Sequence, residues 1–144
     1  MERWEKEAEF VLELMKKDEE LMFSDDDTDH TQRKKHDEFV KKWGFSYNDM
    51  LDLDNSIAMF ILPRIAYFLK NNICIPSVFT KISDDGKVEN EEQARQQWNS
   101  ILETICDGFH LYLEKSFSDF TDEEKELWNK AKKYLIDYFE CLWY

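Results

Sequence analysis

Glycine and proline are scarce in this chain, with 3 Gly and 2 Pro among 144 residues. The tight turns of sheet proteins are built largely from these residues, so their scarcity disfavours an all-β fold. Long hydrophobic runs are also missing. The longest, 57–63, is far shorter than the roughly 20 residues that a membrane-spanning helix needs. The first ten residues, "MERWEKEAEF", are charged and lack the apolar core of a secretory signal. We therefore expect a soluble, cytoplasmic protein without a membrane anchor.

Cysteine occurs in a pattern that disfavours a zinc ribbon. The chain has 3 cysteines, Cys74, Cys106 and Cys141, and no CxxC pair. An odd number at wide spacing is typical of small apolar core residues in a reducing compartment. Cys106 also falls on the apolar face of an expected helix, where burial makes a thiol unreactive.

Motifs that would identify an enzyme are missing as well. The chain contains no GxSxG, HExxH, GxGxxG or phosphate-binding P-loop. Neither Ser56 nor Ser77 is followed or preceded by His and Asp in the order of a catalytic triad. His110, beside Phe109 on an expected helix, is interpreted as a packing or partly exposed residue. We therefore predict no catalytic residue and no cofactor.

Helical periodicity and aromatic residues are abundant instead, with 5 Trp, 6 Tyr and 11 Phe. Apolar residues at spacings of three and four predict an all-α fold, a single-domain helical bundle of five or six helices that spans 1–144. The stretch 71–90 is irregular, with a turn at Asp85-Gly86 and either a short strand or an extended loop at 78–82. The expected helices cover 2–22, 31–43, 47–53 and 55–71, then one that follows Asn90 and one that follows Thr121 and runs to the C-terminus.

The helix at 55–71 contains Pro63 in its most apolar part. A proline inside a helix removes one hydrogen bond and clashes with the preceding turn, at a cost of roughly 3 kcal/mol. The helix could therefore end near Leu62, with Pro63 opening the next helix. Helical spacing continues across the proline, so we favour one kinked, central helix that is buried nearly all round. Arg64 lies on its apolar face and is a candidate to pair with a nearby acid.

Acidic charge is in excess and unevenly distributed. The net charge is −13, and residues 1–30 hold twelve acidic and four basic residues. Residues 31–48 are the exception, with five basic and two acidic residues. We therefore expect an acidic N-terminal helix, 2–22, followed by a short basic segment.

An acidic surface argues against direct nucleic-acid binding, which needs positive charge along a phosphate backbone. It suits the opposite role, in which carboxylates bind a basic surface on another protein. Solubility alone is the competing explanation. The predicted partner-binding residues are Glu13, Asp18, Glu19, Glu20, Asp25, Asp26, Asp27, Asp29, Asp122, Glu123 and Glu124.

Three carboxylates, Asp49, Asp52 and Asp54, precede the buried helix and are weak candidates for a magnesium site. Helix capping and the helix dipole explain the same pattern more simply. A second acidic group, Asp25, Asp27 and Asp29, has calcium-loop spacing. This loop has His30 where glycine is needed and His36 where glutamate is needed. A transition-metal site with Asp29, Asp37 and the two histidines lacks a further ligand. We predict no metal site.

Three segments carry a resemblance to a known family: "GFSYNDMLDLDNSIAMFILPRIAYF" (44–68), "WNSILETICDGF" (98–109) and "EEKELWNKAKKYLIDYFECLW" (123–143). In these segments the chain resembles small uncharacterised proteins encoded by tailed bacteriophages. The family-like core is 44–143. The family has no activity that assigns a role to any residue here. The resemblance implies an infected bacterial host as the setting, where small acidic phage proteins often bind a host protein.

These observations favour a phage-encoded inhibitor that binds a host defence protein, for example a CRISPR effector, with its acidic surface in place of a nucleic acid. One alternative is a structural or accessory protein of the phage particle. A second alternative is a metal-dependent enzyme acting on nucleotides through Asp49, Asp52 and Asp54. The apolar C-terminal stretch "YFECLWY" makes self-association into a homo-oligomer a further expectation.

Overall fold

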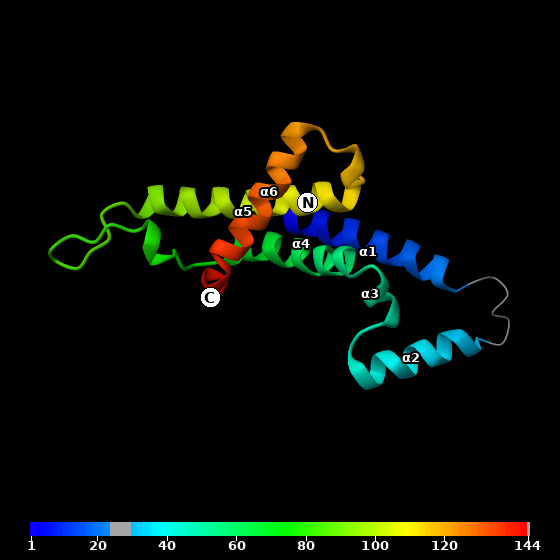
Figure 1. The fold of residues 1–144 in the computed structure, drawn as a ribbon. Coiled ribbons are helices and arrows are strands. Elements are labelled where there is room, and N and C mark those ends of the chain that lie inside the picture. Colours follow the sequence, from blue (N-terminus) through cyan, green and yellow to red (C-terminus); the bar gives the residue numbers. More distant parts are fainter. Residues whose placement is uncertain (24–29, 144) are drawn as a thin grey trace.

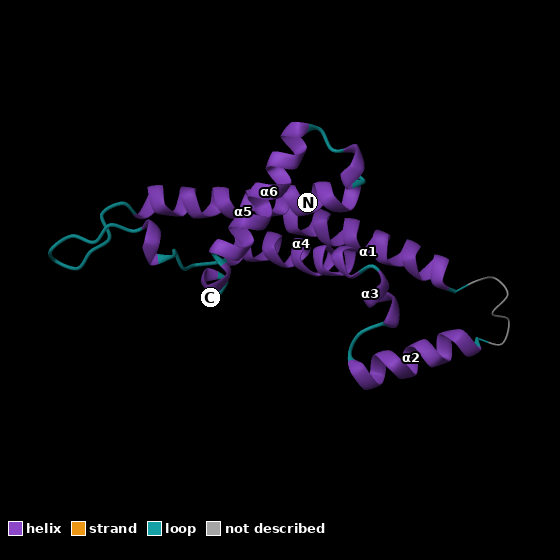
Figure 2. Ribbon diagram, in the orientation of Figure 1, coloured by secondary structure: helices purple, strands orange, loops and turns teal. Residues whose placement is uncertain are grey.

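The computed structural model describes residues 1–23 and 30–143. This part of the chain forms α-helices joined by loops and three short 3-10 turns, η1 (Ser77–Phe79), η2 (Phe117–Asp119) and η3 (Phe139–Cys141). It contains no strand, only an isolated bridge between Ile82 and Val88 (Figure 2). The predicted all-α fold is therefore confirmed. The helices are α1 (Arg3–Met22), α2 (Thr31–Trp43), α3 (Tyr47–Leu51), α4 (Leu53–Asn71), α5 (Glu91–Glu114) and α6 (Asp122–Asp137).

The helices α4 and α5 pack against each other and organise the bundle (Figure 1). α1 packs on α4, and α6 crosses α5 on the other side. α3 is a short helix that leads into α4. α2 stands apart from the bundle at one end of the molecule, beyond α3.

The core is concentrated where α4 meets α5. The side chains of Leu62, Trp98, Leu102 and Ile105 are fully buried there. Rings surround the Trp98 indole, including Phe68 at a centroid distance of 6.4 Å and an interplanar angle of 86°. Edge-to-face aromatic pairs add about 0.5–1.5 kcal/mol beyond the burial of their area. Part of the aromatic content of the sequence thus packs around Trp98.

The central helix α4 continues through Pro63, as the spacing predicted. The expectation that α4 is buried nearly all round is wrong, because Ile57, Phe60 and Tyr67 are exposed on its outer side. Arg64 also lies on this exposed side and pairs with no acid among the described residues. Its guanidinium lies 3.8 Å from the Phe60 ring centroid and donates to the Phe60 carbonyl at 2.9 Å.

Helix ends follow the predicted capping chemistry in several places. Ser46 with Asp49, and Thr121 with Glu124, form capping boxes at the starts of α3 and α6. Gly44 ends α2 with a φ of 79°, in the left-handed region that glycine adopts without strain. The prediction that the last helix runs to the C-terminus is wrong. α6 ends at Asp137, and the chain then turns so that residues 141 and 142 pack on the core.

One glycine fixes how closely α5 and α6 approach. A Cβ built on Gly108 would lie 2.2 Å from the Cβ of Ala131, and 3.5 Å from the Leu127 carbonyl oxygen. The missing side chain therefore lets the two helices cross in direct contact. Any larger residue at position 108 must push α6 away from the core.

We predict that Gly108→Ala destabilises the protein by about 1–3 kcal/mol, because the clash with Ala131 exceeds the gain of about 1 kcal/mol in helix propensity. Urea unfolding followed by circular dichroism measures the change. The double variant Gly108→Ala, Ala131→Gly makes room for the added methyl group and should recover part of the loss. A stabilised single variant would contradict the close crossing.

Candidate functional site

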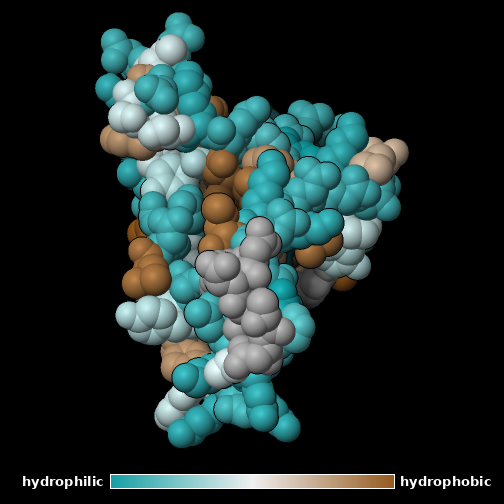
Figure 3. Space-filling model, turned by 90° about the vertical axis from the view of Figure 1, so that its right-hand side faces the viewer, coloured by the Kyte–Doolittle hydropathy of each residue, from teal (hydrophilic) through white to brown (hydrophobic). Residues whose placement is uncertain are grey.

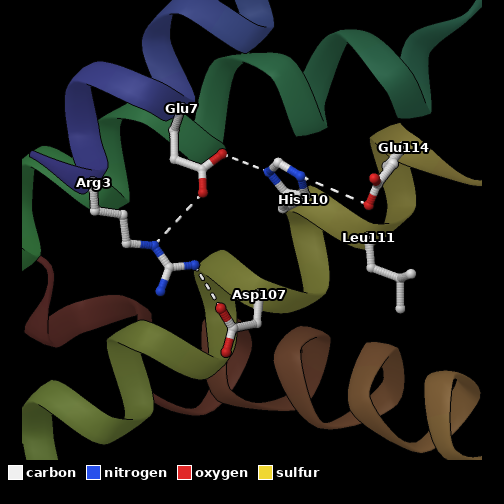
Figure 4. A pocket seen from close by; sticks show the side chains of 6 residues that line it. All are labelled: Arg3, Glu7, Asp107, His110, Leu111 and Glu114. Atoms are coloured by element: carbon white, nitrogen blue, oxygen red, sulfur yellow. Dashed lines mark hydrogen bonds and ion pairs between the residues drawn. The ribbon is translucent and has the colours of Figure 1, made fainter. Parts of the chain in front are cut away.

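A network of charged side chains joins α1 to α5 and lines a hollow between them (Figure 4). Glu7 of α1 is buried at its centre, with Oε2 2.6 Å from His110 Nδ1 and Oε1 3.6 Å from Arg3 Nε. Arg3 Nη2 donates to Asp107 Oδ1 at 2.5 Å. On the far side of the imidazole, His110 Nε2 lies 3.8 Å from Glu114 Oε2.

This network stabilises the contact between α1 and α5. The hollow has a volume of about 260 Å³ and is open to solvent. Its acidic and imidazole side chains, Glu7, Asp107, His110 and Glu114, are paired with one another or with Arg3. The His110 ring stacks on Phe10 with the centroids 4.5 Å apart. The interpretation of His110 as a packing, partly exposed residue therefore agrees with the structure.

One cysteine, Cys106, is made unreactive by its burial. All three are free, and Cys106 is fully buried in the α4–α5 core. Burial raises the pKa of the Cys106 thiol to about 12, so the nucleophilic thiolate is not formed at neutral pH.

Sequence reasoning did not identify the Glu7–His110 contact, because the two residues are 103 positions apart. A partial signal was present. Arg3, Glu7 and Phe10 follow the i, i+4, i+7 spacing along the edge of the apolar face of α1. A carboxylate at that position is covered when the face packs, and burial of a carboxylate requires partners.

The three carboxylates proposed as a magnesium site are each engaged separately. Asp49 accepts from the Ser46 amide at 2.8 Å, as part of the α3 cap. Asp52 accepts from Asn55 Nδ2 at 2.8 Å. Asp54 accepts a hydrogen bond from the Tyr112 hydroxyl of α5. The structure does not bring these carboxylates together as a metal site. Across residues 1–23 and 30–143, no group of three His, Cys, Asp or Glu side chains could hold a metal ion.

The calcium-spaced acids Asp25, Asp27 and Asp29 lie outside the described residues, as does Asp26. Of the histidines near them, His36 Nδ1 lies 3.2 Å from Asp37 Oδ1. His30 precedes α2 with a φ of 56°. The described part of this segment therefore supplies one His–Asp contact and no cluster of ligands.

The Asp54–Tyr112 hydrogen bond fastens α4 to α5 at the molecular surface. It holds the pKa of Asp54 below its usual range, and it is also the main reason that the pKa of Tyr112 rises to about 12. The Tyr112 ring stacks on Trp128 of α6, with centroids 4.3 Å apart and planes 11° apart. One tyrosine thus contacts both α4 and α6.

The acidic candidates of α1 lie on its exposed C-terminal half, at Glu13, Asp18, Glu19 and Glu20. Glu19 accepts from Arg33 of α2 at 2.7 Å. The other three form no ion pair with any residue that the structure describes.

A second acidic group, Asp122, Glu123 and Glu124, occupies the first turn of α6. Carboxylates there interact favourably with the helix dipole. Glu124 is engaged further, because Lys115 Nζ donates to it at 2.7 Å. Figure 1 shows the start of α6 at the top of the view and the end of α1 at the right, so the two acidic groups occupy separate parts of the surface.

Comparison of the chain with protein-family models, with curated proteins and with solved structures gave no match. The resemblance to phage proteins therefore stays a prediction. Among the described residues, no helix has the length and hydrophobicity needed to cross a membrane.

We predict that Glu7→Ala lowers the free energy of unfolding by about 2 kcal/mol, because His110 and Arg3 lose a buried partner. Chemical denaturation at neutral pH measures the loss. Glu9→Ala, an exposed position on the same helix, is the matched control and should change stability by less than about 0.5 kcal/mol. Equal effects of the two substitutions would contradict a structural role for the network.

We predict that Tyr112→Phe destabilises the protein by at most about 1 kcal/mol, because the lost bond to Asp54 is exposed to solvent. The lowered pKa of Asp54 means that its contribution is present above the ordinary carboxyl pKa and is lost as the pH falls through the lowered value. The raised pKa of Tyr112 means that its contribution is lost as the pH rises towards about 12.

The stability difference between the wild type and Tyr112→Phe should therefore be largest between about pH 4 and about pH 10. Thermal unfolding at pH values below, within and above this range tests the shape of the dependence. Tyr134→Phe is the control, since the Tyr134 hydroxyl has no hydrogen-bond partner among the described residues. A Tyr112→Phe effect that does not vary with pH would argue against the Asp54 contact.

Proposed function

We propose that this is a phage-encoded binding protein that inhibits a host defence protein, for example a CRISPR effector, by docking its acidic surface on a basic one. The observation that carries the proposal is the exposed acidic half of α1. Glu13, Asp18 and Glu20 point to solvent and form no ion pair with a described residue. Uncompensated surface charge of one sign raises the rate of association with an oppositely charged partner.

The arrangement of α1 makes this surface available. Its N-terminal half is fixed to the bundle by Val11 in the core and by the Glu7 network. Its C-terminal half extends towards the end of the molecule that carries α2 (Figure 1). Glu13 and Glu20 are seven residues apart, which places them on the same side of the helix. Two carboxylates about two turns apart on one side of a helix match the spacing of successive phosphates in a nucleic acid only loosely. We therefore propose that α1 attracts a basic groove by its charge and does not imitate the bases.

The proposed setting is the cytoplasm of the infected bacterial host, and it rests on the resemblance to phage proteins. The proposal includes no catalytic step and no cofactor and needs only the exposed charge of α1. Charged residues raise the rate at which the two proteins meet. Aromatic or aliphatic side chains at the centre of an interface usually supply most of the affinity.

Affinity capture from the infected host, followed by quantitative mass spectrometry, tests the proposal. We predict that Glu13→Lys with Glu20→Lys reduces the recovered host protein about tenfold. Glu103→Lys with Glu126→Lys makes the same change in net charge at two other exposed positions and should leave recovery nearly unchanged. Recovery should also fall as salt rises from about 0.05 M to about 0.5 M, because screening weakens exposed charges.

Binding that survives the α1 substitutions and does not weaken with salt would reject charge-led docking. Stoichiometric amounts of the protein in purified virions would instead support the alternative role as a structural or accessory protein of the particle.

A further inference from the structure

The helix α2 has an apolar stripe that the described chain does not bury. Of its thirteen residues none is buried, and Trp43 is 55% exposed. Phe39 and Val40 are half-buried, and the Phe39 ring meets Phe45 edge to face, with centroids 5.7 Å apart. A helix of this length is marginal by itself in water, because most helical stability in proteins comes from packing. α2 therefore needs a further surface against which to pack.

Beside α2 the molecule has an apolar groove. It lies between α1, α2, α3 and α4 and has a volume of about 480 Å³. Figure 3 views this end of the molecule and shows brown hydrophobic residues at the surface between hydrophilic ones. The apolar residues that line the groove are Leu12, Met15, Val40, Phe45 and Met59.

Exposed apolar residues occur in the groove and continue beyond it. Leu12 in the groove is 64% exposed, and eight large apolar side chains from Trp43 to Phe60, both included, are also exposed. Single exposed apolar residues are ordinary, but a concentration on one end of a small protein marks an interaction surface. Methionines at such a surface, here Met15 and Met59, adapt their shape to a partner.

The rim of the groove is acidic. Four carboxylates and one lysine are among its lining residues, and Lys16 is that lysine. The acids come from opposite sides: Asp18 and Glu19 belong to α1, whereas Asp49 and Asp52 lie at α3 and at the start of α4. An apolar floor between two acidic edges suits a helix with an apolar stripe flanked by basic residues.

Among the helices that the structure describes, α2 itself is of that kind. It carries five basic and two acidic residues in a chain of net charge −13. Lys35 and Lys42 are seven residues apart and lie on one flank of the stripe formed by Phe39 and Trp43. Neither lysine forms an ion pair with a described residue. Every copy of the chain therefore carries both the groove and a helix that matches it in hydrophobicity and charge.

We propose that α2 of a second copy of this chain fills the groove, and that the contact is reciprocal, so that two copies form a symmetric dimer. The apolar stripe of the incoming α2 covers Leu12 and Met15, and its basic flank meets Asp18 or Asp52. Because a two-fold contact uses the same surfaces twice, each favourable pair is formed twice. The dimer buries the two features that the single chain leaves uncovered. This surface differs from the C-terminal stretch that the sequence indicated for self-association.

Sedimentation velocity of the full chain over a concentration series tests the dimer. We expect a monomer–dimer equilibrium whose dissociation constant rises about tenfold or more in the variant Lys35→Glu, Lys42→Glu. The matched control is Lys34→Glu, Lys41→Glu. These lysines have the same spacing on the same helix but lie on the side opposite the stripe formed by Phe39 and Trp43. This variant should therefore dimerise within about twofold of the wild type. Circular dichroism establishes that each variant keeps its helical content.

Exchanging the charges of the two surfaces is the decisive experiment. Asp18→Lys with Asp52→Lys should weaken the dimer in the same way as Lys35→Glu with Lys42→Glu. An equimolar mixture of the two weakened variants should form a heterodimer, which native mass spectrometry resolves by mass. Asp18→Lys alone, on exposed α1, replaces the double variant if the change at Asp52 disturbs the start of α4.

Three results would each overturn the proposal. They are a wild-type chain that stays monomeric at every concentration, a dimer that both lysine pairs weaken equally, and a mixture of charge-exchanged variants that fails to associate. None of them bears on capture of a host protein through Glu13 and Glu20, so the two proposals fail independently.

Discussion

The apolar contact between α4 and α5 is the interaction on which the rest of the fold depends. Leu62 and Ala66 of α4, and Trp98, Leu102 and Ile105 of α5, are almost completely buried in it. Full burial of such a side chain contributes about 1.5–3 kcal/mol. The other packed helices contact this pair separately, α1 on α4 and α6 on α5. The position of each therefore depends on the α4–α5 contact.

This arrangement determines where charge can lie. The α4–α5 contact excludes charged groups, and Glu7 is the buried acid among the described residues. Its burial is compensated by His110 of α5 and by Arg3, one turn earlier on α1 itself. The other acids that the structure describes are exposed or half-buried, and water or the helix dipole stabilises them. A net charge of −13 thus becomes a surface property without weakening the core.

Local patterns made much of the fold predictable. The apolar spacing located all the long helices that the structure describes. The capping residues Ser46 and Thr121 precede the short helix α3 and the long helix α6, and such signals act within a few residues. Tertiary features were not predictable in this way. Asp54 was expected to cap a helix but bonds to Tyr112, 58 positions away. The outer face of α4 is as apolar as its inner face, so periodicity could not show that Phe60 is exposed.

The same limit applies to α2. Local patterns do not show tertiary contacts, so the sequence of α2 revealed less about its role than its place in the structure does. Its pattern predicted a helix, yet the described residues leave Trp43 exposed and Phe39 only half-buried. Its basic charge is opposite to that of the rest of the molecule and matches the acidic rim beside it. Asp18 belongs both to this rim and to the acidic half of α1. A basic partner that engages Asp18 would therefore compete with α2 of the second copy, so the dimer contact would protect the acidic surface until such a partner displaced it.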